Sequence, residues 1–175
     1  RYNGFYVARY EAGLEDGDIV FKDASEENST ITTAGASNPS TKTWYGLYSK
    51  IKGFATAEDS VVSSMIWGSQ YDAMLNWVLT GDEANMVFER TGNHSGSKAK
   101  TGRWGSDIMN NIFDLSSNTA EWTQEAAYSS QRADRGSFYN PASTGGASFR
   151  SSSYPTSAYY SSSSRLTLYM RSSEP

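Results

Sequence analysis

The side chains best suited to acid–base chemistry in this sequence are its carboxylates, and adjacent pairs occur at Glu26-Glu27, Glu58-Asp59 and Asp82-Glu83. Side chains that are neighbours in sequence point apart on a helix or a strand. Two carboxylates that act as acid and base must instead flank one substrate bond. We therefore interpret these pairs as solvated faces.

Nucleophilic and cofactor chemistry has few candidates. Cysteine is absent, which excludes disulfides, thiolate catalysis and cysteine-ligated metals. The one histidine, His94, lies in the glycine-rich residues 91–96, a stretch typical of a solvated loop. Serine is abundant, but a serine nucleophile needs a base beside it. The glycines of residues 92–105 lack the strand, turn and helix of a phosphate-binding loop. We therefore expect no enzyme, no cofactor and no metal site.

Oxygen ligands of the kind that Ca²⁺ prefers gather at Asp114, Asn118 and Glu121. A calcium site is one interpretation of this group. The other is structural, with Asn118 capping a turn and Glu121 pairing with an arginine that points inward.

Three arginines are evenly spaced in the C-terminal part of the chain, at Arg135, Arg150 and Arg165. The tract that contains them has no acid after Asp134. A guanidinium group has five donors in a fixed fork, so each could brace loops against backbone carbonyls and Glu121. We expect this scaffolding role in preference to direct contact with a ligand.

The tract from residue 135 to residue 171 is the stretch around which the chain is organised. Between residues 133 and 165 there is no Lys, Glu, Gln, Met or Trp, and Ser, Tyr, Phe, Ala, Gly and Arg fill the space. A polar tract can be a disordered linker. Tyrosine among small polar residues is also typical of evolved binding surfaces, because its ring supplies rigid contact area. We interpret the tract as a display surface.

Length and charge narrow the class of protein. A chain of 175 residues fits one domain, residues 1–175, that buries about 70% of its unfolded surface. The net charge is −4 without a basic cluster, which disfavours nucleic acid as a partner. No apolar run is long enough to cross a membrane, so we expect no membrane insertion. The chain starts at Arg1, which suggests an excised domain or a processed product.

Two helices are predicted in the first half. Thr43 would cap a helix with Trp44, Leu47, Tyr48 and Ile51 on one face, ending at Gly53. The second helix would run from about residue 69 to residue 79 and end before Gly81. Its inward stripe is Tyr71, Met74, Leu75 and Val78.

Strands are predicted on both sides of these helices. The alternating pattern of residues 5–11 predicts a strand, and residues 19–21, 119–123 and 166–170 are further short candidates. Residues 63–67 and 112–115 are short apolar segments. Residues 25–43 and 82–111 are expected to be mostly loop. The sequence therefore predicts an α+β domain with two helices, short antiparallel strands and long loops.

Several segments, taken in order, carry a family resemblance. They are residues 4–11, residues 66–73, the Asp-Leu-x-x-Asn-x-x-Glu-Trp-Thr element of residues 114–123, Arg135-Gly136-Ser137 and residues 165–168. This order resembles the formylglycine-generating-enzyme-like branch of the C-type lectin fold, across nearly the whole chain. The chain departs from that branch at Ser117, Ala120 and Ser137, where Gly, Trp and Gly are usual.

The resemblance implies the fold and argues against the activity of that branch. Its copper-dependent oxidases need cysteines, and related sulfoxide-forming enzymes need several histidines. The chain is more similar to the variable proteins of diversity-generating retroelements, which share this fold. Their C-terminal segment is diversified by adenine-directed mutagenesis, and mutating AAC or AAT codons at adenine does not produce the five residue types absent from the tract.

This resemblance implies a ligand- or receptor-binding domain at a phage tail or on a bacterial cell surface, with an unidentified protein or glycan receptor. Exposed aromatic residues would be the anchors, and serines would surround them. The predicted contact residues are Phe138, Tyr139, Asn140, Phe149, Ser151, Ser152, Ser153, Tyr154, Tyr159, Tyr160, Ser161 and Ser162. The opposing interpretation makes Phe149 and Tyr160 core residues. The alternative function is a calcium-dependent carbohydrate-binding lectin, although the Glu-Pro-Asn triplet of animal lectins is absent.

Overall fold

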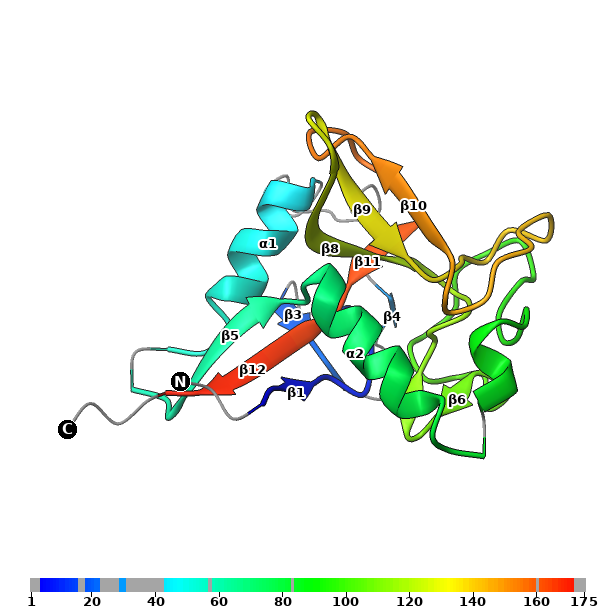
Figure 1. The fold of residues 1–175 in the computed structure, drawn as a ribbon. Coiled ribbons are helices and arrows are strands. Elements are labelled where there is room, and N and C mark those ends of the chain that lie inside the picture. The colour runs from blue at the N-terminus through cyan, green and yellow to red at the C-terminus, as the bar shows by residue number, and fades with distance from the viewer. Residues whose placement is uncertain are drawn as a thin grey trace.

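The structure, a computed structural model, describes residues 4–15, 18–22, 29–30, 43–56, 58–82, 84–159 and 161–171. Two α-helices and short, mainly antiparallel strands make up the described part, which is the α+β class that the sequence predicts. Figure 1 shows β1 and β12, the first and last strands, lying side by side.

The sheet that joins the two ends of the chain has the order β1-β12-β5. Its strands are β1 (Tyr6–Val7), β12 (Leu166–Met170) and β5 (Val61–Met65), all antiparallel neighbours. The predicted strand at residues 166–170 is confirmed. The predicted strand over residues 5–11 is wrong beyond Val7. After that residue the carbonyls of Ala8 and Arg9 accept hydrogen bonds from the Arg165 side chain, and the Arg9 carbonyl also accepts one from the Phe113 amide.

Both predicted helices are confirmed. Helix α1 (Trp44–Lys52) begins after Thr43, whose hydroxyl accepts a hydrogen bond of 3.3 Å from the Gly46 amide. Helix α2 (Gly68–Val78) buries the predicted stripe of Tyr71, Met74, Leu75 and Val78. Each helix therefore turns one apolar face into the core, as the period of its sequence requires.

The second sheet contains two strands of the tract together with strands that precede it, and has the order β10-β9-β8-β11. Its strands are β8 (Ala120–Tyr128), β9 (Gln131–Arg135), β10 (Arg150–Ser153) and β11 (Ser162–Ser164). Strand β8 contains part of the predicted strand and continues five residues past it, to Tyr128, before the turn into β9. Strand β11 lies parallel to β8, with Ser162 opposite Ala120. The sequence did not predict β9, β10 or β11. The serine-rich runs of β10 and β11 carry little strand signal, and Ala133 is the single apolar residue of β9.

Smaller elements lie between these layers. They are β2 (Gly13–Glu15), β3 (Asp18–Val20), β4 (Ser29–Thr30), a 3₁₀ helix at Ala84–Val87, β6 (Ile108–Met109) and β7 (Ile112–Phe113). Strand β3 contains most of the predicted strand at residues 19–21, and β7 forms the first half of the apolar stretch at residues 112–115. Most of the predicted loop at residues 25–43 falls outside the described residues.

The core consists of two apolar clusters. One packs α1 against β5, β8 and β12 through Trp44, Leu47, Ile51, Met65 and Trp122. The other packs α2 against the loops near β6 and β7, and its members include Tyr71, Met74, Val78, Met109 and Leu115. Trp122 of β8 thus packs the second sheet against the first core cluster.

Candidate ligand-binding surface

Two adjoining hollows open on the tract. The larger has a volume of about 490 Å³ and is lined by Gly96, Phe138, Tyr139, Asn140, Pro141 and Ser161. The smaller has a volume of about 120 Å³ and is lined by Ala120, Asp134, Gly136, Phe138, Phe149, Ser151, Ser153, Ser161 and Ser162. Phe138 and Ser161 line both, so the two hollows meet along these residues.

Backbone hydrogen bonds fix the loop that carries the aromatic residues of the larger hollow. The Tyr139 amide donates to the Asn118 carbonyl at 3.1 Å, and the Gly96 amide donates to the Tyr139 carbonyl at 2.9 Å. The rings of Phe138 and Tyr139 meet edge to face, with their centroids 5.9 Å apart. The side chains of this loop can therefore change while its backbone stays in place.

His94 braces the same loop from below. Its ring nitrogens lie 3.0 Å from the carbonyl oxygens of Phe138 and Thr91. Burial lowers the pKa of His94, and the nearby Arg90 lowers it further. A residue predicted to be a solvated loop histidine is therefore half-buried and structural.

The register of the β9–β10 ladder places the serines of β10 on two different faces of the sheet. Ser151 pairs with Asp134 across the β9–β10 ladder, and alternate residues of a strand share a face. Ser151 and Ser153 accordingly line the smaller hollow beside Asp134. Ser152 falls on the other face, where its hydroxyl donates to the Gln131 side chain at 2.7 Å.

The predicted contact residues differ in exposure. Phe149 and Tyr154 are 47% and 51% exposed, so the interpretation of Phe149 as a core residue is wrong. Tyr159 is half-buried on the first core cluster, with its ring centroid 5.8 Å from that of Trp122. Ser162 is only 2% exposed and forms part of the floor of the smaller hollow. Tyr160 lies outside the described residues.

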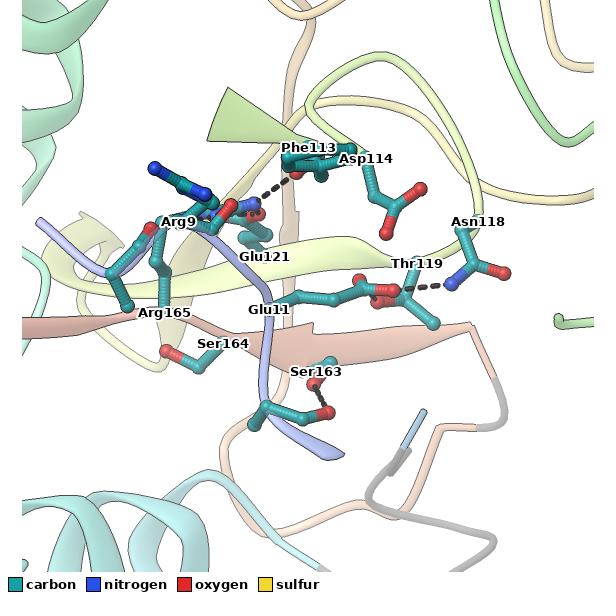
Figure 2. A network of polar contacts seen from close by, with 12 residues as sticks. Arg9, Glu11, Phe113, Asp114, Asn118, Thr119, Glu121, Ser163, Ser164 and Arg165 are labelled. Carbon is teal, nitrogen blue, oxygen red and sulfur yellow. Dashed lines mark hydrogen bonds and ion pairs between the residues drawn. The ribbon is translucent and has the colours of Figure 1, made fainter. Parts of the chain in front are cut away.

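Arg165, directly after β11, joins several buried segments of the chain. Its guanidinium binds Glu121, with Nε 2.9 Å from Oε1, and donates to the carbonyls of Ala8 and Arg9 at 2.8 Å and of Phe113 at 2.7 Å. Both charged side chains are buried. Figure 2 shows Arg165 among these segments, which are remote in sequence. The predicted pairing of Glu121 with an inward arginine is confirmed.

A second buried carboxylate, Glu11, was not identified from the sequence. Asn118 donates to it through its side-chain amide and Thr119 through its hydroxyl (Figure 2). Burial raises the pKa of Glu11 well above its usual value, and Asp114 adds to the rise. The alternating pattern of residues 5–11 gave no hint that this acid points into the protein.

A third buried carboxylate, Asp107, holds the turn before β8. It accepts hydrogen bonds from the Ser116 amide at 3.0 Å and from the Ser117 hydroxyl at 2.6 Å. Burial raises the pKa of Asp107 to about 7. The turn of residues 114–118 is therefore fixed by side chains from distant parts of the chain.

Each residue proposed as a calcium ligand already has a side-chain oxygen that accepts a hydrogen bond. The carboxylate of Glu121 accepts from Arg165, and the side-chain oxygen of Asn118 accepts from the Ala99 amide at 2.7 Å. Oδ2 of Asp114 accepts from the Gly102 amide at 2.6 Å. Over the described residues, no group of three His, Cys, Asp or Glu side chains is arranged to hold a metal ion.

The other two arginines pair with acids on the far face of the sheet. Arg135 lies 2.6 Å from Asp72 of α2 and stacks over the ring of Tyr71. Arg150 lies 2.6 Å from Glu125 of β8. Gly136 follows with a φ of +72°, and a side chain there would overlap the Leu115 carbonyl, so this turn requires glycine.

Asp134 is the functional candidate that the sequence analysis missed. It is 5% exposed, lines the smaller hollow, and accepts a hydrogen bond of 2.9 Å from the Ser153 hydroxyl. Burial raises its pKa. The available signal was its position as the one acid between residues 133 and 165.

Comparison with known proteins gives a likeness of fold alone. No protein-family model and no curated protein matches the sequence. The crystal structure of CarF matches 98% of this chain and 77% of its own at 11% identity, with a TM-score of 0.50. Treponema denticola variable protein 1 matches 90% of this chain and 61% of its own at 14% identity, with a TM-score of 0.44, too weak to carry an argument. None of the described helices has the length and apolar character to cross a membrane.

Proposed function

We propose that the chain is a non-enzymatic binding domain of the C-type lectin fold that displays a diversified surface to a receptor. The main support for this proposal is that most of the predicted contact residues of the tract line two adjoining hollows. Between these residues in the sequence lie others that are buried and form hydrogen bonds with the rest of the fold.

The arrangement of the backbone supports the fold assignment. The first and last strands pair within one sheet, and two helices flank it. Long loops lead into a second sheet that contains strands β10 and β11 of the tract. The order of these elements agrees with the resemblance stated from the sequence.

We call the buried residues 162–165 the floor and residues 138–140, 149, 151 and 154 the rim. The fixed contacts of the floor support the diversified surface. Arg165, Glu121, Ser163 and Ser164 are all buried, and each forms hydrogen bonds that do not involve the side chains of the rim. A surface that tolerates many sequences needs such independence, because each variant must still fold. The receptor would be a protein or glycan met at a virion tail or a bacterial cell surface.

The first experiment reads DNA. The gene and its flank are sequenced, and a near-copy of the codons for residues 133–171 is sought beside a reverse transcriptase gene. Differences confined to adenines would establish the diversified surface and name its variable positions. A flank without such a copy would contradict diversification and leave a fixed binding site.

A second experiment tests the surface itself. Residues 138–140, 149, 151 and 154 are randomised together, and the fraction of protease-resistant clones is measured by display. A matched library randomises residues 162–164. We expect most clones of the first library to fold and few of the second. Equal fractions would contradict the separation of rim from floor.

A further inference from the structure

The smaller hollow is lined by an acid, Asp134, that has no cationic partner within the described part of the chain. Asp134 is nine-tenths buried, and it forms hydrogen bonds with the hydroxyl groups of Ser153 and Ser151. Among the described residues the ion pairs are Arg135–Asp72, Arg150–Glu125 and Arg165–Glu121, and none includes Asp134. Buried carboxylates in proteins are normally paired, so an unmatched one is unusual.

The position of Asp134 directs it toward a ligand. It lies on β9 between Ser151 of β10 and Trp122 of β8, on the sheet face that forms the hollow. Arg150 is near enough to lower its pKa, but by strand alternation it lies on the opposite face, where it binds Glu125. The rest of the lining carries no charged side chain.

The walls are suited to a cation. Phe138 and Phe149 line the hollow, and aromatic ring faces attract ammonium and guanidinium groups. A volume of about 120 Å³ accommodates the end of one side chain. A carboxylate that receives a cation here would form a charge-assisted hydrogen bond away from bulk water.

We propose that the smaller hollow binds a lysine or arginine side chain of a protein receptor, with Asp134 as counter-ion and Phe138 and Phe149 as walls. This inference rests on the proposed binding function and narrows its partner to a protein with an exposed cationic residue. Asp134 would be a fixed anchor among rim residues that change.

The probes are N-acetyl-lysine methylamide and N-acetyl-arginine methylamide, titrated into the isotope-labelled domain and followed by NMR. We expect one or both to shift the amide signals of Phe149, Ser151 and Ser153. The neutral isostere N-acetyl-norleucine methylamide should leave these signals in place. An equal response to the norleucine probe, or to a methyl glycoside, would overturn the proposal.

Two variants sharpen the test. D134N retains an acceptor for Ser153 and removes the charge, so it should fold and bind the cationic probe roughly tenfold more weakly or worse. D72N is the matched control, because it removes an exposed acid from the other face of the sheet, and it should bind as the unmodified domain does. Equal weakening by both would show a general charge effect and overturn the site.

A third variant guards against misfolding of D134N. Phe149 is half-exposed, so F149L should fold normally while losing the ring that faces the cation. We expect weaker binding of the cationic probe and an unchanged melting temperature. Full binding by F149L would contradict the aromatic wall. A missing gene template with intact lysine binding would instead contradict diversification alone, so the two proposals fail separately.

Discussion

Two serine-rich strands of this molecule, β10 and β11, differ in how deeply their side chains are buried. On β11, Ser163 and Ser164 are fully buried, and their hydroxyls donate to the carbonyls of Ala12 and Trp122. On β10, Ser151 is exposed at the edge of a hollow. The difference arises because β11 lies between β8 and the segment near Ala12, whereas β10 is an edge strand. Strand position, and not residue type, therefore separates the floor (residues 162–165) from the rim (residues 138–140, 149, 151 and 154).

The largest expected effect on stability comes from removing the buried ion pair of the floor, Arg165–Glu121. Replacing Arg165 with Met leaves Glu121 buried without its partner, which should cost about 3–5 kcal/mol of unfolding free energy. R150M, which breaks a partly exposed pair, should cost no more than about 1 kcal/mol. Urea unfolding of both variants measures the difference. Equal losses would mean that the floor is no more rigid than the surface.

Enlarging a serine tests the same contrast by volume. Ser164→Tyr must push apart a packed interior and should destabilise the domain by about 1–3 kcal/mol or more. Ser151→Tyr adds the same atoms at the rim, and we expect a change of about 0.5 kcal/mol. Thermal unfolding distinguishes the two, and a well-folded S164Y would show that the floor also tolerates diversity.

The tyrosines of the tract should also differ in how much each contributes to stability. Tyr159→Ala removes a ring that packs on Trp122 and accepts a hydrogen bond from the Tyr154 amide, so a loss of about 1–2 kcal/mol is expected. Tyr154→Ala should change stability little, because its side chain is half-exposed. If the two variants unfold at one temperature, Tyr159 belongs to the rim.

The buried acids predict a pH dependence that the rim does not share. Because burial raises the pKa of Asp107 to about 7, the folded state binds more protons than the unfolded chain between about pH 4 and pH 7. Its stabilising protonation is therefore lost as pH rises through 7, and the raised pKa of Glu11 acts in the same direction. The melting temperature should fall by on the order of a few degrees from pH 6 to pH 8. D107N should flatten this slope, and an unchanged slope would exclude Asp107 as its source.

The smallest effect concerns calcium. Since Glu121, Asn118 and Asp114 already accept protein hydrogen bonds, a chelator should leave the melting temperature unchanged. A lower melting temperature with the chelator, restored by added Ca²⁺, would reinstate the lectin alternative and show that the floor depends on an ion.

Apolar periodicity predicted the helices and β12 because packing decides those elements. Trp44, Leu47 and Ile51 recur at helical spacing, and Leu166 to Met170 forms a compact apolar run. The serine strands could not be predicted, since β11 is defined by its neighbours β8 and Ala12 and not by its own side chains. Glu11 and Asp134 were missed for a related reason. Burial of an acid depends on donors supplied from distant positions, such as Asn118 and Ser153.

Pairing of β1 with β12 has a consequence for the rate of folding. Tyr6 lies opposite Leu168, so this ladder closes only when segments separated by nearly the whole chain meet. Contacts of such long sequence separation slow folding, because a large loop must be closed before they form. During synthesis the sheet cannot close until Leu168 has been made, and the predicted contact residues, which lie between residues 138 and 162, are made before it. Variation in the tract is therefore tested at the last step of folding, and we expect it to alter the yield of folded protein before it alters equilibrium stability.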